Sequence, residues 1–341
     1  MVSLTEVQSS NSLIPSVLPP GLVAVFVGAT SGIGETTLKQ FAKYTRQPRI
    51  YFIGRSQEAG DRITVECKAL NKEGEYAFIK ADVSLIKVVD DICQDIKSKE
   101  QAINLLFQCQ GTMVPQTKST EDLHIALALP HYSRARFIVN LLPHIQRATA
   151  LRRVVSVFTG GKEGHIDMSD FQGWNVKSVL KSRGHASSIV TLSLEAMAKK
   201  APDVTFIHGF PSAVKTGIAR DLKGAPGIIV RTVFGIIGPF VYVPNLECGE
   251  RHLFLATSAK YPPASAGETA ASMVPLGDGL SVARGIDGKA GSGVYSIEQN
   301  LESAGPKVEA LLDGFRKEGL VEEVWDRTTK EFRRITGVEE V

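Results

Sequence analysis

Short apolar runs alternate with helix-like stretches along most of this chain, and this alternation limits the folds that are possible. The runs have strand length and are rich in β-branched and aromatic residues, whereas the stretches between them repeat apolar residues every three or four positions. Strands separated by helices pair in parallel through right-handed crossovers, which indicates an α/β fold with a doubly wound, Rossmann-like parallel sheet. The expected strands are Leu22–Val27, Arg49–Ile53, Glu75–Ile79, Asn104–Gln108, Arg153–Phe158, Val204–Phe210 and Gly293–Ile297.

The helical stretches complete this pattern and suggest one domain. The sequence shows no internal repeat and no linker, so residues 21–341 are expected to form a single NAD(P)-binding domain with a C-terminal helical extension over about 249–341. Residues 1–20 are expected to form an N-terminal surface arm, and residues 218–248 a substrate lid. The expected helices are Gly32–Tyr44, Glu58–Asn71, Ser84–Lys99, Thr120–Arg147, Lys177–Met197, Glu250–Ser258 and two near the C-terminus.

Composition excludes several classes of protein. Hydrophobic residues make up 43% and charged residues 22% of the 341 positions, which is typical of a globular protein. A net charge of +3, spread along the chain, leaves no basic patch for nucleic acid. The four cysteines are widely separated and no secretory segment precedes them, so a reduced, cytoplasmic protein without a metal site is expected. The apolar stretch Pro226–Val243 is interrupted by Arg231 and by glycines, which favours a buried or lid-forming segment over an integral membrane span.

A glycine-rich turn follows the first expected strand directly and opens the first long helix. It reads GATSGIG, from Gly28 to Gly34. A dinucleotide pyrophosphate requires a tight backbone turn, no side chain where it approaches, and free N–H groups at a helix N-terminus. This position in a βαβ series therefore predicts nucleotide binding through Gly28, Thr30, Ser31, Gly32, Ile33 and Gly34.

With the spacing G-x-x-x-G-x-G, the chain resembles the short-chain dehydrogenase/reductase (SDR) superfamily, although Val27 stands where the family usually has threonine. Three further motifs follow in the family's order: ADVS at 81–84, QCQG at 108–111 and PSAVKTG at 211–217. The resemblance runs from Leu22 to Gly217. It implies that the cofactor is also contacted by Asp82, Val83, Gln110, Gly111, Pro211, Val214 and Thr216.

The end of the second expected strand indicates which dinucleotide binds. An NAD-dependent enzyme usually places an acidic residue there, which holds the ribose 2′-hydroxyl and repels a 2′-phosphate. This chain has Arg55, followed by Ser56. Because a guanidinium can form paired hydrogen bonds with phosphate, NADP(H) is favoured over NAD(H).

The catalytic residues that the resemblance implies are only partly present. The family uses Asn, Ser, Tyr and Lys, and aligning RVVSVFTGG with its serine motif places Thr159 at the serine position. Aligning VTLSLEAM with the following helix places the tyrosine and lysine positions at Leu180 and Gly184, which cannot do that chemistry. The asparagine position falls near Pro130 and His131. A Tyr-x-x-x-Lys pattern does occur at Tyr76–Lys80, but it lies in the third expected strand, far from the catalytic end.

Two hypotheses remain for the missing proton donor. In the first, His185 replaces the tyrosine, with Lys181 one helical turn earlier and His131 and Tyr132 on the neighbouring helix, since a histidine exchanges protons near neutral pH. In the second, these residues only pack or lie at the surface.

Two functions remain as well. The whole chain resembles divergent SDRs of fungal secondary-metabolite pathways. This resemblance implies an NADP-dependent oxidoreductase that acts on a ketone or alcohol of an apolar polyketide or terpenoid intermediate. A homo-oligomer is the form of assembly considered. The alternative is an SDR-like protein that performs a non-redox step or only binds nucleotide.

Overall fold

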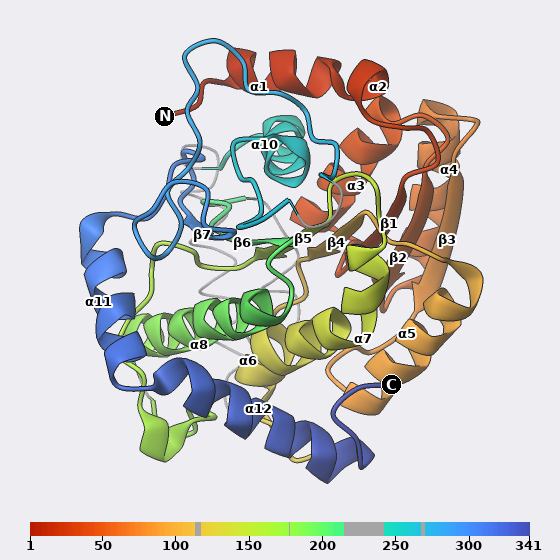
Figure 1. The fold of residues 1–341 in the computed structure, drawn as a ribbon. Coiled ribbons are helices and arrows are strands. Elements are labelled where there is room, and N and C mark those ends of the chain that lie inside the picture. Colours follow the sequence, from red (N-terminus) through yellow and green to blue (C-terminus); the bar gives the residue numbers. More distant parts are fainter. Residues whose placement is uncertain (113–116, 177, 215–241, 267–269) are drawn as a thin grey trace.

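The centre of the protein is a seven-stranded, fully parallel sheet, seen in a computed structural model that describes residues 1–112, 117–176, 178–214, 242–266 and 270–341. Its strand order is β3-β2-β1-β4-β5-β6-β7, with helices on both faces (Figure 1). The predicted Rossmann-like architecture is therefore confirmed. The strands are β1 Val23–Val27, β2 Arg49–Gly54, β3 Glu75–Lys80, β4 Leu105–Gln108, β5 Arg153–Val157, β6 Thr205–Gly209 and β7 Val294–Ile297.

Helices cover the sheet in layers. On one face α3 packs against α10, and α1 packs outside α10; on the other face lie α5, α7 and α8, with α12 as an outer layer against α8 and α5 (Figure 1). The first crossover, β1-α3-β2, lies where the glycine turn predicts it. The helices are α1 Leu4–Ser12, α2 Ile14–Val17, α3 Gly32–Tyr44, α4 Gln57–Leu70, α5 Ile86–Lys99, α6 Ile125–Leu127, α7 Arg134–Gln146, α8 Val179–Lys200, α10 Asn245–Thr257, α11 Pro306–Lys317 and α12 Leu320–Thr336.

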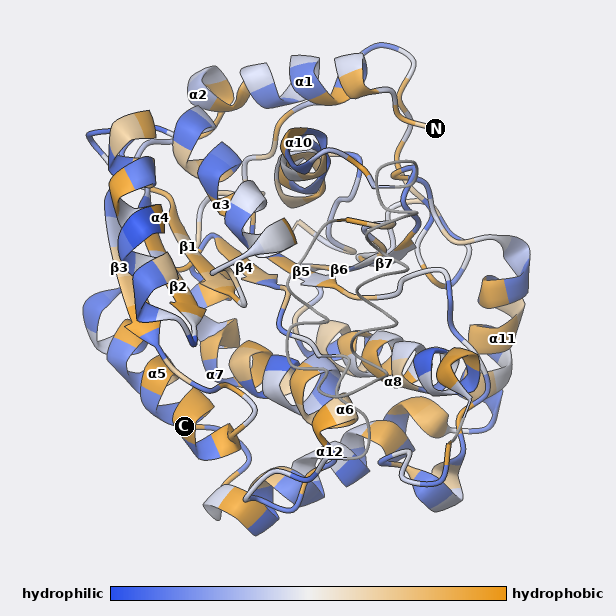
Figure 2. Cartoon of the chain, turned by 180° about the vertical axis from the view of Figure 1, so that it is seen from behind, coloured by the Kyte–Doolittle hydropathy of each residue, from blue (hydrophilic) through white to orange (hydrophobic). Residues whose placement is uncertain are grey.

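The sheet separates two hydrophobic cores, because successive side chains of a strand point to opposite faces. In β1, Val23, Val25 and Val27 join the core under α5, α7 and α8, whereas Ala24 and Phe26 join the core under α3 and α10. The strands are mainly apolar, whereas α12 alternates apolar and polar colours (Figure 2). This pattern is typical of a central parallel sheet that is buried on both faces.

The first 20 residues, expected as a surface arm, contain two helices that are anchored to the rest of the protein. Ser3 and Glu6 form a capping box that starts α1, and Val2 and Val7 are fully buried. The side chain of Asn11 donates to the Glu250 carboxylate at 2.6 Å, which joins α1 to α10. The pattern Ser-x-x-Glu at Ser3–Glu6 is the sequence signal from which this helix could have been predicted, although only a surface arm was expected here.

The helix expected over Thr120–Arg147 begins later and is irregular. Asp122 has a positive φ of 64°, and the Ser119 hydroxyl accepts from the Leu123 N–H, so these residues form a turn. A short α6 is followed by a π-helix over Ala128–Ser133, and regular α7 starts only at Arg134. π-Helical segments are frequent at functional sites.

The lid and the apolar stretch fall mostly outside the described residues. Of the expected lid, residues 218–241 are not described, and 245–248 belong to α10, which starts directly after Pro244. Across the described ranges no helix is long and apolar enough to cross a bilayer.

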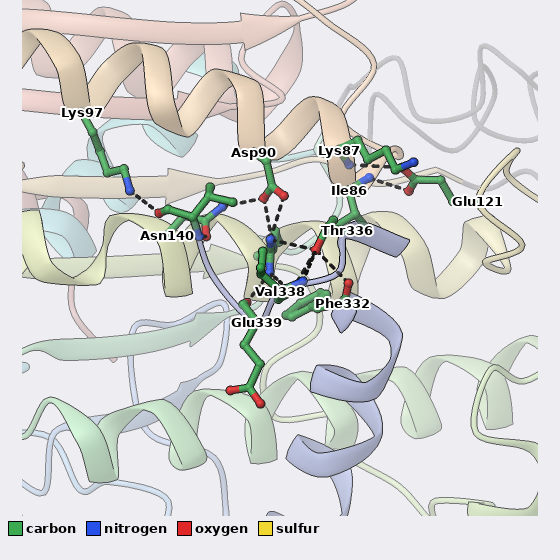
Figure 3. Close-up of polar contacts among 12 residues, drawn as sticks. Ile86, Lys87, Asp90, Lys97, Glu121, Asn140, Phe332, Thr336, Val338 and Glu339 are labelled. Carbon is green, nitrogen blue, oxygen red and sulfur yellow. Dashed lines mark hydrogen bonds and ion pairs between the residues drawn. The ribbon is translucent and has the colours of Figure 1, made fainter. Parts of the chain in front are cut away.

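The end of α12 is joined to helices α5 and α7 through a buried ion pair (Figure 3). Arg136 of α7 is fully buried and pairs with Asp90 of α5 through Nε–Oδ1 at 2.5 Å and Nη2–Oδ2 at 2.7 Å. The same guanidinium donates to the Thr336 hydroxyl and to the backbone carbonyls of Val338 and Glu339. Arg136 therefore fastens the end of α12 to both α5 and α7.

Candidate active site

A cavity of about 590 Å³ opens at the carboxyl ends of β1, β2 and β4, where ligands bind in doubly wound sheets. It brings together ten of the residues predicted to bind cofactor. Gly32 lies in the first turn of α3 but does not line the cavity, Pro211 and Val214 lie after β6 outside the lining, and Thr216 is outside the described residues. The predicted residues in the lining are Gly28, Thr30, Ser31, Ile33, Gly34, Arg55, Asp82, Val83, Gln110 and Gly111.

The glycine turn leaves no room for side chains. Gly28 has a φ of 78°, and a Cβ there would lie 2.6 Å from the Gln110 nitrogen. A Cβ on Gly34 would lie 2.7 Å from the Gly28 carbonyl oxygen, so the start of α3 can approach the turn only with glycine. The first N–H groups of α3 face this cavity without a side-chain cap from Ser31, as expected of an anion-binding helix N-terminus.

Two charged residues that were predicted to bind cofactor, Arg55 after β2 and Asp82 after β3, lie at the rim of the cavity. Arg55 and Ser56 line the cavity after β2, and the Ser56 hydroxyl also caps α4 by accepting from Ala59 N–H at 3.2 Å. After β3, the Asp82 carboxylate accepts the Ser84 N–H at 3.0 Å. Asp82 is the only acidic residue in the lining formed by the described residues.

A buried arginine that the sequence did not reveal supports the floor of the site. Arg134 donates to the Gln110 carbonyl and to the Ser156 hydroxyl, both at 2.7 Å. Burial lowers the pKa of this guanidinium to about 10. An arginine at the start of a helix normally predicts a solvated charge, and only the tertiary structure brings Arg134 beneath Gln110.

Thr159, at the serine position, lies in the turn after β5. Its N–H donates to His208 Nε2 at 3.1 Å and its carbonyl accepts from the Ser187 hydroxyl at 2.7 Å. Its own hydroxyl is buried and has no partner among the described residues. Thr159 does not line the 590 Å³ cavity, so the structure places it apart from the predicted cofactor residues gathered there.

A buried carboxylate lies behind this turn. Glu163 accepts from the hydroxyls of Thr191 at 2.8 Å and Ser296 at 2.6 Å, and His208 Nδ1 lies 3.6 Å away. Burial acts to raise the pKa of Glu163, but the hydrogen bonds and the neighbouring His208 outweigh it, so the pKa is lowered. No sequence motif marked Glu163, Thr191, His208 and Ser296, which come from four separate segments.

The positions where the resemblance places the family's tyrosine and lysine lie in the first two turns of α8. Leu180 is 67% exposed at the start of α8. Gly184 packs against the backbone of Gly164, whose N–H donates to the Gly184 carbonyl at 3.1 Å, and a Cβ at Gly184 would lie 3.1 Å from the Gly164 Cα. Tyr76 lies in β3, where its hydroxyl donates to the Asn71 carbonyl, as its position in a strand predicted.

His185 is held by the backbone at both ring nitrogens. Nδ1 accepts the Asp167 N–H at 3.1 Å, so Nε2 carries the proton and donates to the Phe171 carbonyl at 2.9 Å. The residue is 4% exposed, whereas Lys181 points to the exposed surface of α8. This geometry argues against His185 and Lys181 as a replacement for the missing donor and supports the packing hypothesis.

His131, the other histidine considered, is also engaged. Its Nε2 lies 2.9 Å from the Thr328 hydroxyl and its Nδ1 3.4 Å from the Ser193 hydroxyl. Burial, together with the nearby His185, lowers the pKa of His131 to about 3, so it stays neutral at physiological pH. Tyr132 is buried beside it against Phe171 and Phe332.

We expect His185→Gln to leave turnover within about twofold of the wild-type rate, because the ring makes two structural hydrogen bonds and offers none to a substrate. Loss of one buried hydrogen bond should lower the free energy of unfolding by roughly 1 kcal/mol. Steady-state kinetics over a range of pH and chemical denaturation measure the two effects. A selective fall in kcat with unchanged stability would restore the proton-donor hypothesis.

Comparison with known proteins agrees with this architecture. Residues 22–166 match the family described as short chain dehydrogenase. The chain is 38% identical to oxidoreductase AN1596 of Emericella nidulans over 96% of its length and 97% of that protein. It is 32% identical to oxidoreductase andH of Emericella variicolor, over 99% and 98% of the two chains. L-Sorbose reductase from Gluconobacter frateurii, solved with NADPH and L-sorbose, has the same fold with a TM-score of 0.53 at 16% identity, covering 70% of this chain and 90% of that one.

The fold and its nucleotide site thus define a dinucleotide-binding α/β protein. The chain belongs to the short-chain dehydrogenase/reductase family, and it is an oxidoreductase similar to those of several fungi. Within the described residues, no group of side chains is suited to hold a metal ion.

Proposed function

We propose that this oxidoreductase uses NADP(H) to reduce a ketone, or oxidise an alcohol, on an apolar small molecule of polyketide or terpenoid type. The observation that carries the cofactor assignment is the cavity itself, in which the glycine turn, the N-terminus of α3 and Arg55 line one continuous surface. When bound, NADPH supplies the hydride. The chain supplies backbone N–H groups for the pyrophosphate, and Arg55 with Ser56 for the 2′-phosphate.

The Thr159 hydroxyl is the group that we assign to the substrate oxygen. Its backbone is fixed by two hydrogen bonds, and its hydroxyl can donate one more. A hydroxyl that donates to a carbonyl oxygen favours hydride addition, because negative charge develops on that oxygen in the transition state. The absence of the usual tyrosine and lysine predicts a slower enzyme, since a positioned acid contributes roughly 10²–10⁴-fold.

The substrate class rests on the sequence and on the fungal relatives. The apolar stretch Pro226–Val243 follows the family's P-x-x-V-x-T motif, where it would suit an apolar ligand. We further propose a cytoplasmic protein, which can act as a homo-oligomer.

A non-redox step is the second candidate, and one observation favours it. The contact between Gly164 and Gly184 leaves little room where the family has its lysine, because a Cβ at Gly184 would lie 3.1 Å from the Gly164 Cα. Such a protein would bind nucleotide but catalyse isomerisation, cyclisation or dehydration, or no reaction.

Incubation with 4-deuterated NADPH distinguishes the two functions. A panel of apolar ketones, including aryl alkyl ketones and decalones, is incubated with the protein and with NADPH labelled separately on each face of C4. An alcohol one mass unit heavier with one of the two labels supports the proposed function. A product without label, or nucleotide binding without any product, supports the second candidate.

A further inference from the structure

A continuous chain of hydrogen bonds runs from the backbone of the Thr159 turn to the buried carboxylate of Glu163. Thr159 N–H donates to His208 Nε2 at 3.1 Å, and His208 Nδ1 lies 2.8 Å from the Thr191 hydroxyl. The Thr191 hydroxyl in turn lies 2.8 Å from Glu163 Oε1. On the other side, Gly161 N–H donates to the Ser296 hydroxyl at 2.7 Å, which lies 2.6 Å from the same carboxylate oxygen.

The donors and acceptors in this chain can be assigned in one way. Because Nε2 of His208 accepts a backbone N–H, its proton lies on Nδ1, and the ring donates to the Thr191 oxygen. The Thr191 hydroxyl then has its own proton left for Glu163. Ser296 likewise accepts from the backbone and donates to Glu163. Every bond therefore points toward the Glu163 carboxylate.

Stability alone does not account for this arrangement. The side chains of Glu163 and His208 are both fully buried, and Glu163 Oε2 has no partner among the described residues. A buried carboxylate that is only partly hydrogen-bonded costs free energy relative to an apolar side chain of the same volume. These hydrogen bonds do hold two backbone N–H groups in fixed positions in the turn after β5. They are the N–H groups of Thr159 and Gly161, which are two residues apart.

We infer that Glu163 and His208 are positioning residues, which orient the Thr159 hydroxyl by fixing the turn 159–161. The inference rests on the proposed function to the extent that Thr159 contacts the reacting oxygen. Glu163 collects the two branches, one through β6 and α8 and the other through β7, so that a single carboxylate sets both N–H groups. Neither positioning residue has to contact substrate or cofactor.

Glu163→Gln is the first test, because an amide keeps the size of the side chain while it removes the charge that organises the donors. We expect kcat to fall about tenfold. The Kd for NADPH should not change, because none of these hydrogen-bonded residues lines the cavity. Ser296→Ala, which removes only the Gly161 branch, should lower kcat by about threefold. The matched control is Glu195→Gln, a largely buried glutamate later in α8 that pairs with Arg316 at 2.7 Å and should leave kcat unchanged.

A double-mutant cycle shows whether the effect passes through Thr159. Thr159→Val should lower kcat by about 100-fold, and adding Glu163→Gln should then change kcat by less than about twofold, because the hydroxyl to be positioned is gone. Multiplied losses in the double variant would overturn the inference. So would a kcat for Glu163→Gln equal to that of the wild-type protein.

Hydrogen exchange gives a reading that does not depend on turnover. In Glu163→Met, which removes the carboxylate oxygen to which both hydroxyls donate, the amides of Thr159 and Gly161 should exchange at least about tenfold faster, whereas those of β1 should not change. Unchanged exchange at both amides would overturn the inference, whatever the activity. If the wild-type protein transfers no deuteride to any ketone, the proposed function fails, and accelerated exchange would still show that Glu163 fixes the turn.

Discussion

Replacing Asp90 by alanine should destabilise the protein by about 3–5 kcal/mol, since it leaves the buried Arg136 guanidinium without its counter-ion. Arg136 is 0% exposed, so water cannot take over the role of the carboxylate. Asn140 also donates to Asp90 Oδ1, at 2.8 Å, and would lose its partner. This is a large part of the 5–15 kcal/mol that a typical domain has in total.

Chemical denaturation measures this loss, and limited proteolysis locates it. Because Arg136 also holds the backbone of Val338 and Glu339, cleavage near the end of α12 should be faster in the variant. The matched control is Asp90→Leu combined with Arg136→Met, in which both charges are removed and most of the stability should return. A loss below about 1 kcal/mol for Asp90→Ala would show that the pair is not an essential connection.

The fold could be predicted because its signals are local in the sequence. The strands β1, β4, β5, β6 and β7 are buried along their whole length and appear as mainly apolar runs, whereas the edge strand β3 is partly exposed. Helix α3 has the predicted bounds Gly32–Tyr44 because the glycine turn fixes its start. Much of the nucleotide site follows for the same reason, since residues after β1, β2, β3 and β4 meet at one edge of a parallel sheet. Ten predicted cofactor residues lie in one cavity on this account.

The catalytic end could not be predicted in the same way, because its residues meet only through tertiary packing. Arg134 reaches Gln110 from a helix that begins irregularly, and no propensity scale anticipates a π-helix at Ala128–Ser133. Glu163 and His208 are distant in sequence and belong to no motif. In the sequence, His185 was a more evident candidate for the proton donor than Glu163 or His208. In the structure, however, both ring nitrogens of His185 are hydrogen-bonded to the backbone of Asp167 and Phe171.

The absence of the family's tyrosine and lysine is easier to interpret from the contact between Gly164 and Gly184 than from either glycine alone. Gly184 by itself looks like the simple loss of a lysine. Its contact with Gly164 shows that the turn after β5 lies against this position of α8, and the same turn carries Thr159 and Glu163. We therefore expect that the double substitution Leu180→Tyr with Gly184→Lys would require a shift of the Gly164 backbone.

The largest expected effect on binding is that of Arg55→Ala, which should weaken NADPH binding by about 10- to 100-fold and leave NADH binding nearly unchanged. A charge-assisted hydrogen bond to phosphate contributes roughly 1.5–3 kcal/mol, and about 1.4 kcal/mol corresponds to a tenfold change in Kd. Arg55 and Ser56 both line the cavity after β2, and NADH has no 2′-phosphate for either to bind. In the wild-type protein NADPH should accordingly bind more tightly than NADH.

Titration of both cofactors by nicotinamide fluorescence measures this preference, with Arg62→Ala as the matched control. Arg62 is a nearby arginine of α4 that forms an ion pair with Glu35 at 2.7 Å and does not line the cavity, so its loss should change neither affinity. The NADPH preference should also weaken with added salt in the wild-type protein and much less in Arg55→Ala, because screening acts on the pairing between guanidinium and phosphate. Equal affinities of the wild-type protein for NADPH and NADH would contradict the assignment of Arg55 to the 2′-phosphate.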